Sequence, residues 1–226
     1  MGGLTSGRGL RTARVAAFDA ELVRRWIRET AAQLSAQRDY LTQLDAAIGD
    51  ADHGINMDRG FAAAASALEA SDEATPGALL VQTGTTLMFR VGGAAGPLYG
   101  TSFREAGGAL EDVGTFGMGE LIVALRSGLE GIQSLGAAVE GDKTIVDAWA
   151  PAVAAMERGA RAKSSAREVL RSGRLAAEAG ATATTPMQAR KGRASYLGPR
   201  SVGHQDPGAT STALLFTALE RAVEAS

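Results

Sequence analysis

The 226-residue sequence predicts an all-α fold. Apolar residues recur at steps of three and four through most of the chain, which is the spacing of a buried helix face. No segment shows the strict alternation of apolar and polar residues that is typical of a half-buried strand. One expected helix start, at Thr75, is followed by proline at the first helical position. We therefore expect a bundle of antiparallel helices.

The first four helices follow from their apolar stripes. The first runs from Phe18 to Leu44, and the second repeats the same step from Met57 to Leu68. The third begins at the Thr75-Pro76 pair and extends to about Val91. The fourth begins near Pro97 and carries Tyr99, Phe103, Ala106 and Leu110 on one face.

Four further helices complete the chain. The fifth covers 118–132, and the sixth begins at an expected N-cap, Asp142, and continues to about Met156. The seventh, about 164–181, has few large apolar residues among many alanines. The eighth begins at Asp206-Pro207 and continues to about Val223. The expected architecture is therefore eight helices, which short connections arrange as antiparallel neighbours.

Composition limits the partners and the compartment. There is no cysteine, so a metal site must use oxygen or histidine ligands. A net charge of -2 gives no general attraction for nucleic acid or anionic lipid, so neither partner is expected. No apolar run has the length of a membrane span, and the first residues do not resemble a secretory signal, which favours a cytoplasmic protein. We expect a loosely ordered tail at 1–17 and a single domain at 18–226.

The connections between the helices are of two kinds. Those between helices two and three, four and five, and six and seven are short and plain. The other four are rich in glycine and functional groups, and the last of them, 184–208, has the length of a lid or binding loop. In an antiparallel bundle these four connections lie at the same end. The sequence therefore predicts one functional end and one structural end.

The connection after the first helix contains three aspartates within eight positions. Asp45, Asp50 and Asp52 offer the oxygen ligands that Mg²⁺ prefers, and Gly49 allows a sharp turn between them. A calcium EF-hand is excluded, because its glycine and glutamate positions are Ile55 and Phe61 here. The alternative is that the three carboxylates are helix caps and solvated loop charges. The adjacent His53 and the glycines favour a metal site.

Two helix starts have the features of anion sites. His53, Gly54, Ile55 and Asn56 open the second helix, and the segment 92–96 opens the fourth. Backbone N–H groups at a helix start lack intrahelical partners and carry the positive end of the helix dipole. Glycine-rich turns can also be simple tight corners. A carboxylate metal site between two such helix starts favours a nucleoside diphosphate or triphosphate as the ligand.

Other candidate motifs have simpler interpretations. The segment 136–144 resembles a P-loop, but Asp142 occupies the position of its lysine and no strand precedes it. The basic stretch Arg190, Lys191 and Arg193 is a phosphate or partner contact or a solvated loop, rather than an RNA patch. His204 is interpreted as a structural hydrogen-bonding residue. No serine, histidine and aspartate arrangement for nucleophilic catalysis is visible.

Four segments together resemble the nucleotide-binding L subunit of dihydroxyacetone kinase: LDAAIGDADHGINMDRGF, GGAAGPLYGTSF, GDKTIVDAWAP and MQARKGRASYLGPRSVGHQDPGATS. The resemblance extends in order from about Phe18. It implies a barrel of eight antiparallel helices with the nucleotide at one end. It also implies that Asp45, Asp50 and Asp52 ligate Mg²⁺, and that phosphates lie against His53, Gly54, Ile55, Asn56, Ala94 and Ala95. The rest of ADP or ATP would lie among Gly136, Ile145, Arg193, Asp206, Pro207 and Gly208.

Two positions depart from the family pattern. Ala95 stands where relatives commonly have serine, so one hydroxyl contact, worth about 0.5–1.5 kcal/mol, is missing. Ile145 replaces a methionine that is often found there and changes the shape of an apolar contact. Nucleotide binding is expected to survive both changes.

The resemblance also implies the reaction and the partners. A γ-phosphoryl group would pass from the nucleotide to dihydroxyacetone held on a separate K subunit, with His53 as a phosphate stabiliser and no covalent protein intermediate. In one branch a phosphohistidine of an M subunit of the phosphotransferase system rephosphorylates bound ADP. The alternatives are a subunit that exchanges ATP and serves dihydroxyacetone or a related short sugar, and a nucleotide-loaded co-regulator that binds a transcription factor.

Overall fold

A computed structural model describes residues 17–225 of the chain. The expected tail at 1–17 therefore lies, except for Ala17, outside the described residues. Helices dominate, as predicted, and two strands of two residues each pair antiparallel through Phe18 and Phe116. The elements are β1 (Phe18–Asp19), α1 (Ala20–Ala36), α2 (Arg38–Ile48), α3 (His53–Glu69), α4 (Pro76–Arg90), α5 (Ala95–Ala109), β2 (Thr115–Phe116), α6 (Met118–Gly136), α7 (Val146–Arg161), α8 (Ala166–Ala183), the 3₁₀ helix η1 (Arg193–Ser201) and α9 (Pro207–Glu224).

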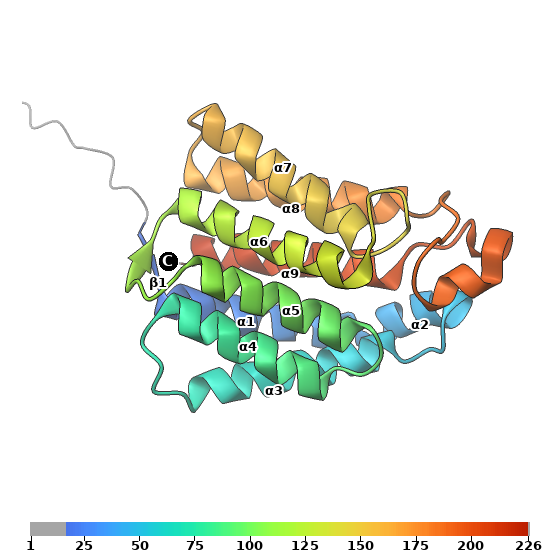
Figure 1. Cartoon of the computed structure of the whole chain (residues 1–226), viewed down its shortest axis with the longest axis horizontal. Coiled ribbons are helices and arrows are strands. Elements are labelled where there is room, and N and C mark those ends of the chain that lie inside the picture. The colour runs from blue at the N-terminus through green and yellow to red at the C-terminus, as the bar shows by residue number, and fades with distance from the viewer. Residues whose placement is uncertain (1–16, 226) are drawn as a thin grey trace, which may run out of the picture.

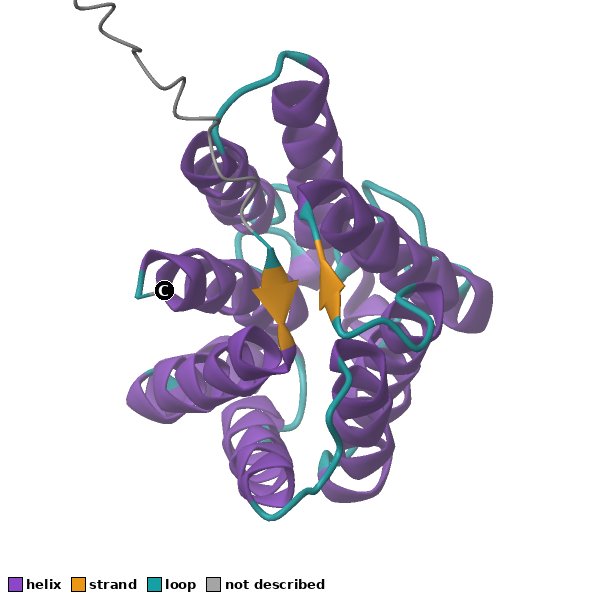
Figure 2. Cartoon of the chain, turned by 90° about the vertical axis from the view of Figure 1, so that its left-hand side faces the viewer, coloured by secondary structure: helices purple, strands orange, loops and turns teal. Residues whose placement is uncertain are grey.

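Eight of the helices form a closed barrel. Each of α3 to α9 packs against its neighbour in sequence, and α1 packs against both α3 and α9, which closes the ring (Figure 1). The β1–β2 pair lies across one end of the barrel (Figure 2). Aromatic rings fill the interior, where Phe61 meets Tyr99 and Phe103 edge-on. The second helix of the chain, α2, extends beyond the ring at the other end (Figure 1).

The prediction of one continuous first helix is wrong, because the helix breaks at Gln37 between α1 and α2. Leu34, Leu41 and Leu44 continue a helical spacing through the break, so the apolar pattern does not reveal it. The two halves have different packing partners. Helix α1 contacts α3, α4 and α9 in the ring, whereas α2 packs on α3, α9 and η1.

The prediction that Asp142 caps the sixth helix is also wrong. Helix α7 begins at Val146, and the Asp142 carboxylate instead accepts the Val139 N–H at 3.0 Å within the preceding turn. Asp147 accepts N–H groups from Gly141 and Thr144, at 2.5 and 2.7 Å. The two carboxylates therefore stabilise a compact connection, and the helix starts after it. The expected caps Thr75 and Asp206 are confirmed, since each accepts an N–H from its own first turn.

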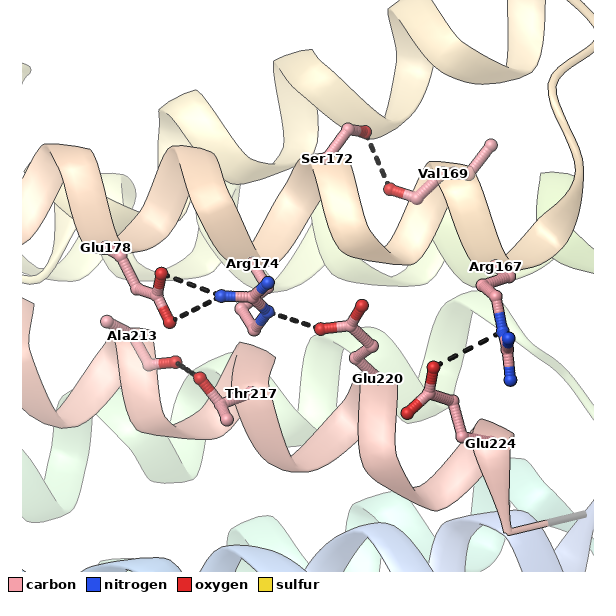
Figure 3. Close-up of polar contacts among 9 residues, drawn as sticks. All are labelled: Arg167, Val169, Ser172, Arg174, Glu178, Ala213, Thr217, Glu220 and Glu224. Atoms are coloured by element: carbon pink, nitrogen blue, oxygen red, sulfur yellow. Dashed lines mark hydrogen bonds and ion pairs between the residues drawn. The ribbon is translucent and has the colours of Figure 1, made fainter.

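The outer faces of α8 and α9 are joined by ion pairs (Figure 3). Arg174 on α8 donates to Glu178 at 2.8 Å and to Glu220 on α9, while Arg167 pairs with Glu224 at 3.3 Å. The seventh expected helix, for which the sequence gives few large apolar residues, thus has polar as well as apolar contacts with its neighbour. Its start is fixed by a capping box between Ser165 and Glu168.

Candidate functional site

The four glycine-rich connections meet around one pocket at the end of the barrel opposite the β1–β2 pair (Figure 1). The pocket has a volume of about 990 Å³, which is at the upper end of the size range of small-molecule sites. Its lining includes nearly all residues expected at the site: Asp45, Asp50, Asp52, His53, Asn56, Ala94, Ala95, Gly136, Ile145, Arg193, Asp206, Pro207 and Gly208. Gly54 and Ile55 are not part of the lining.

The three aspartates converge. One carboxylate oxygen from each of Asp45, Asp50 and Asp52 lies within 4.8 Å of the others. Asp45, at the end of α2, is buried, and its carboxylate accepts the N–H groups of Asp52 and His53 at 2.9 and 3.2 Å. These bonds hold the turn that brings the later carboxylates back toward Asp45. The arrangement concentrates negative charge at one point of the pocket.

Two backbone features make this turn possible. Ala51, between the two later aspartates, has a φ of 62°, in the left-handed region that is uncommon for residues other than glycine. Gly49 serves a different purpose, because a Cβ there would lie 2.0 Å from an Asp45 carboxylate oxygen. The glycine is therefore needed for close approach, and Ala51 supplies the sharp change of direction.

The first turn of α3 is pressed against α2. Gly54 is buried there, and a Cβ on it would lie 2.0 Å from the Arg38 carbonyl oxygen, while the Ile55 side chain is exposed. The helical ladder begins with the Asn56 N–H bonded to the Asp52 carbonyl at 2.9 Å. The N–H groups of Gly54 and Ile55 precede that bond and belong to the positive end of the helix. Their backbone, and not their side chains, makes them candidates for anion contact.

A buried chain of hydrogen bonds fixes His53. Its Nε2 lies 2.9 Å from Ser211 Oγ, which lies 2.8 Å from the Tyr99 hydroxyl, and this hydroxyl in turn meets Thr212 Oγ1 at 2.7 Å. Burial lowers the pKa of His53, although the carboxylates of Asp45 and Asp52 oppose the shift. The imidazole is therefore held neutral beside the carboxylates. The sequence analysis missed Ser211 and Tyr99, which are more than 45 residues from His53.

The start of α5 faces the same pocket. Gly93 has a φ of 64°, and Gly92 lies so close to the Asn56 side chain that a Cβ would come within 2.9 Å of it. Arg59 donates to the Asn56 Oδ1 at 2.7 Å and to the Arg90 carbonyl at 3.0 Å. These contacts tie the start of α3 to the end of α4 and to the turn that leads into α5.

The far side of the pocket is formed by the connections that follow α6 and α8. Gly208 and Ile145 are in close contact, because a Cβ on Gly208 would lie 3.1 Å from the Ile145 side chain. Arg193, at the start of η1, reaches Asp50 at 2.8 Å and links the long connection to the carboxylates. Asp206 caps α9, and burial raises its pKa to about 7. Of the other basic residues, Lys143, Arg190 and Lys191 line the pocket, whereas Arg200 and His204 do not.

Fold and pocket together define a class of protein: all-helical barrels whose connections at one end enclose a site suited to a divalent cation and phosphate groups. Comparisons with known proteins identify the family within this class. Residues 47–221 match the DAK2 domain, and the chain belongs to this family. Among the described residues, none of the helices has the length and apolar character that a membrane span requires.

The most informative relatives are kinase subunits. The chain is 43% identical over 199 residues to the PEP-dependent dihydroxyacetone kinase, ADP-binding subunit DhaL, of Escherichia coli, covering 88% of this chain and 95% of that one. It is 40% identical to the PTS-dependent counterpart of Lactococcus lactis, covering 86% and 93% of the two chains. The structure of the dihydroxyacetone kinase from C. freundii in complex with AMP-PNP and Mg²⁺ is similar, with a TM-score of 0.69 and 28% identity. That match covers 98% of this chain and 37% of the other.

Proposed function

We propose that this chain is the nucleotide-binding phosphotransferase subunit of a dihydroxyacetone kinase, with 18–226 as its single nucleotide-binding domain. The observation that carries the proposal is the convergence of Asp45, Asp50 and Asp52 between the starts of α3 and α5 in one pocket. The relatives named as ADP-binding subunits of dihydroxyacetone kinase, which this chain matches over most of both lengths, support it.

The residues fit Mg²⁺. Three carboxylates whose oxygens lie within 4.8 Å of one another repel unless a positive charge is present, and Mg²⁺ prefers oxygen ligands. Within the described residues, Arg193 supplies a positive group to Asp50. In the proposed holo state Asp45, Asp50 and Asp52 hold the ion. When bound, it would supply positive charge that neutralises the phosphates.

The pocket also fits ADP or ATP. The N–H groups of Gly54 and Ile55 at the start of α3, and those of the pocket-lining turn at Ala94 and Ala95 before α5, would bind phosphate oxygens. His53 and Asn56 lie between these two starts. The rest of the nucleotide would be held by Gly136, Ile145, Arg193, Asp206, Pro207 and Gly208, all of which line the same pocket.

The protein's part in the reaction is to position and to stabilise charge. The two helix starts stabilise the charge that develops on the transferred phosphoryl group. His53, held by Ser211, contributes a fixed polar group beside the phosphates and needs no change of protonation. No side chain forms a covalent intermediate in this scheme, since positioning and electrostatics provide most of the rate enhancement in phosphoryl transfer.

The acceptor is proposed to be dihydroxyacetone on a separate K subunit. Two exposed apolar side chains, Leu135 and Tyr196, line the pocket, and three more, Ile55, Phe89 and Val139, lie within three residues of its lining in the sequence. Apolar side chains that are gathered at one end of a soluble protein are typical of a partner surface. We propose that the K subunit docks there and brings its substrate to the nucleotide. An M subunit that carries a phosphohistidine would then use the same open mouth to rephosphorylate ADP.

A related short sugar is the second candidate acceptor. The chain is 36% identical to L-erythrulose 1-kinase of Mycolicibacterium smegmatis, covering 84% of this chain and 34% of that one. The choice between the sugars would be made on the K subunit, so assays with a purified K subunit and both ketoses decide it.

The test of the proposal is Mg-nucleotide binding. Wild-type protein titrated with ADP and Mg²⁺ by calorimetry should bind one nucleotide per chain, and denaturing freshly purified protein should release about one equivalent of ADP if the nucleotide acts as a coenzyme. Asp50→Asn and Asp52→Asn should each weaken binding at least about tenfold while the circular dichroism stays helical, because a metal ligand is lost. Asp58→Asn, a carboxylate on α3 outside the pocket lining, is the matched control. Wild-type affinity in both site variants would contradict the metal assignment.

A further inference from the structure

Lys143 is a fully buried lysine in the connection between α6 and α7. Its exposed fraction is 1%, and its backbone is in the left-handed region with a φ of 62°. Lysine is among the residues that are least often fully buried, because its ammonium group requires compensation. In the sequence, Lys143 belongs to the rejected P-loop pattern and to the segment GDKTIVDAWAP, and neither predicts a buried ammonium group. The structure gives the side chain a specific set of partners.

Four backbone carbonyl oxygens surround the Lys143 ammonium. Nζ donates to Thr184 at 2.9 Å, to Met187 at 3.2 Å, to Ser201 at 2.8 Å and to His204. Thr184 and Met187 follow α8, whereas Ser201 and His204 precede α9. The ammonium therefore joins both ends of the segment 184–206.

The four contacts of the Lys143 ammonium depend more on its positive charge than on the alignment of individual N–H bonds. An ammonium group has three N–H donors, so four carbonyl oxygens must share them. A shell of backbone carbonyl oxygens is the environment in which proteins bind monovalent cations such as K⁺. The nearby carboxylates have other bonds: Asp147 accepts from Gly141 and Thr144, and Asp206 accepts from Ala209. The carbonyl shell is thus the direct environment of the charge.

The segment that is held in this way carries part of the pocket. Arg193 lies within it and reaches Asp50, and Asp206 lies at its end and caps α9. A further bond runs from the Arg190 N–H to the Asp142 carbonyl at 3.1 Å, so the segment also rests on the residue before Lys143. Within the segment, the Gly203 N–H bonds to the Thr185 carbonyl at 2.8 Å. Two side-chain bonds also join its ends, from the Asp206 N–H to Thr184 Oγ1 and from the Ala189 N–H to Ser201 Oγ, each at 2.9 Å. Release of the ammonium would leave these neutral contacts and the Arg193–Asp50 pair to hold the loop.

We propose that Lys143 acts as a built-in monovalent cation that holds the segment 184–206 closed, and that it is thereby a positioning residue for Arg193 and Asp206 at the pocket. The part of this proposal that concerns the nucleotide rests on the proposed function. The part that concerns the loop does not. A cation of the right size is predicted to replace the ammonium group when the side chain is removed.

The test compares two substitutions at this site with a matched control. Lys143→Ala leaves space within the carbonyl shell, whereas Lys143→Met fills it with an apolar side chain that cannot donate. Lys163→Ala is the control, because Lys163 is also left-handed, with a φ of 57°, and is exposed after α7. Hydrogen–deuterium exchange of 184–206 and calorimetric Mg-ADP affinity are measured for each protein at constant ionic strength, in sodium and then in potassium or ammonium chloride.

In sodium chloride, the backbone amides of 184–206 should exchange faster in both Lys143 variants than in the wild type. Mg-ADP affinity should fall at least about tenfold, which is the size expected when hydrogen bonds to a charged group are lost. Potassium or ammonium ions should restore slow exchange and affinity in Lys143→Ala but not in Lys143→Met. The control should behave as the wild type in every salt. Unchanged exchange in Lys143→Ala, or equal responses of the two variants to the salts, would overturn the proposal.

A measurement on the wild type keeps the test decisive if the variants do not fold. The sequence has three lysines, and a caged ammonium exchanges its protons slowly. One protected ¹⁵N ammonium signal at neutral pH, assigned to Lys143 and not to Lys163 or Lys191, supports the carbonyl shell. If no protected signal is seen, the carbonyl shell is contradicted. If the wild type binds no Mg-ADP, the proposed function fails, while loop exchange and the ammonium signal still decide the role of Lys143.

Discussion

Asp206 is a helix cap whose burial favours the protonated, neutral form of its carboxyl group. Its carboxylate caps α9 by accepting the Ala209 N–H at 2.7 Å, and it is almost fully buried. Burial raises its pKa from 3.8 to about 7, and the charge of Asp147 adds to the shift, while Ala209 and Lys143 oppose it. The folded protein therefore holds a proton on Asp206 that the unfolded chain releases at much lower pH.

This difference predicts a pH-dependent stability. Because the folded pKa lies above the unfolded one, the proton on Asp206 stabilises the fold most below about pH 4, and this contribution is lost as the pH rises through about 7. Asp206→Asn keeps a capping oxygen but cannot titrate. The Tm of the wild type minus that of the variant should therefore fall from about pH 4 to about pH 7 and level off above it, without nucleotide or Mg²⁺. Parallel curves would show that Asp206 does not titrate in this range.

Residue types explain which parts of the site were predictable. Asp45, Asp50 and Asp52 are close in sequence, so their convergence could be expected from composition and one turn. Lys143 and Tyr99 act through partners that lie 41 to 113 residues away. No local pattern marks such contacts, since a buried lysine and a surface lysine look alike in a sequence.

At the scale of elements, the close packing of α2 on α3 depends on Gly54. A Cβ at this position would lie 2.0 Å from the Arg38 carbonyl and 2.5 Å from Thr42 Oγ1, so the two helices would have to separate. Since Asp45 lies in the last turn of α2 and α3 begins at His53, the separation would also disturb the carboxylate cluster.

We predict opposite effects for two glycine-to-alanine changes in helices. Gly54→Ala should destabilise the fold by more than about 2 kcal/mol and weaken Mg-ADP binding, because the new methyl group meets backbone. Gly108→Ala, in α5 with open space around it, should stabilise by roughly 0.5–1 kcal/mol through helix propensity alone. Urea unfolding monitored by circular dichroism measures both. Equal effects would mean that α2 and α3 tolerate separation.

Helix existence was predicted well, and helix boundaries were less secure. Every expected helix is present, but the break at Gln37 was missed because apolar spacing continues across it. The prediction for Asp142 failed because aspartate is favoured both at helix N-caps and in turns, where its carboxylate accepts a nearby backbone N–H. In the structure it accepts the Val139 N–H within a turn. Both errors concern helix boundaries that tertiary packing determines, and apolar periodicity alone does not predict such boundaries.

At the scale of the molecule, the two ends of the barrel have separate tasks. The β1–β2 pair lies at one end, and the long connections gather at the other (Figure 1). These connections line the pocket, and they carry some of the exposed apolar side chains, among them Leu135 and Tyr196. Stability and ligand contact can therefore be changed independently. This separation makes the proposed partner surface testable without loss of the nucleotide site.

Phe89 is the sharpest probe of that surface. It lies near the end of α4, two residues before the turn that leads to the pocket, and its exposed fraction is 83%. A large ring left in water has little to contribute to the isolated fold, so Phe89→Ser should leave Tm and Mg-ADP affinity nearly unchanged. In the complex it should act as an apolar anchor, and its loss should raise the KM for a purified K subunit at least about tenfold.

Val123→Ser provides the matched control, because Val123 is also exposed, at 54%, but lies in the first half of α6, toward the β2 end of that helix. Steady-state phosphoryl transfer with increasing K subunit measures both variants. If Phe89→Ser lowers kcat with an unchanged KM, or if both variants raise KM equally, the docking surface lies elsewhere. A selective rise in KM for Phe89→Ser would place the partner at the mouth of the pocket, where phosphoryl transfer requires the two subunits to meet.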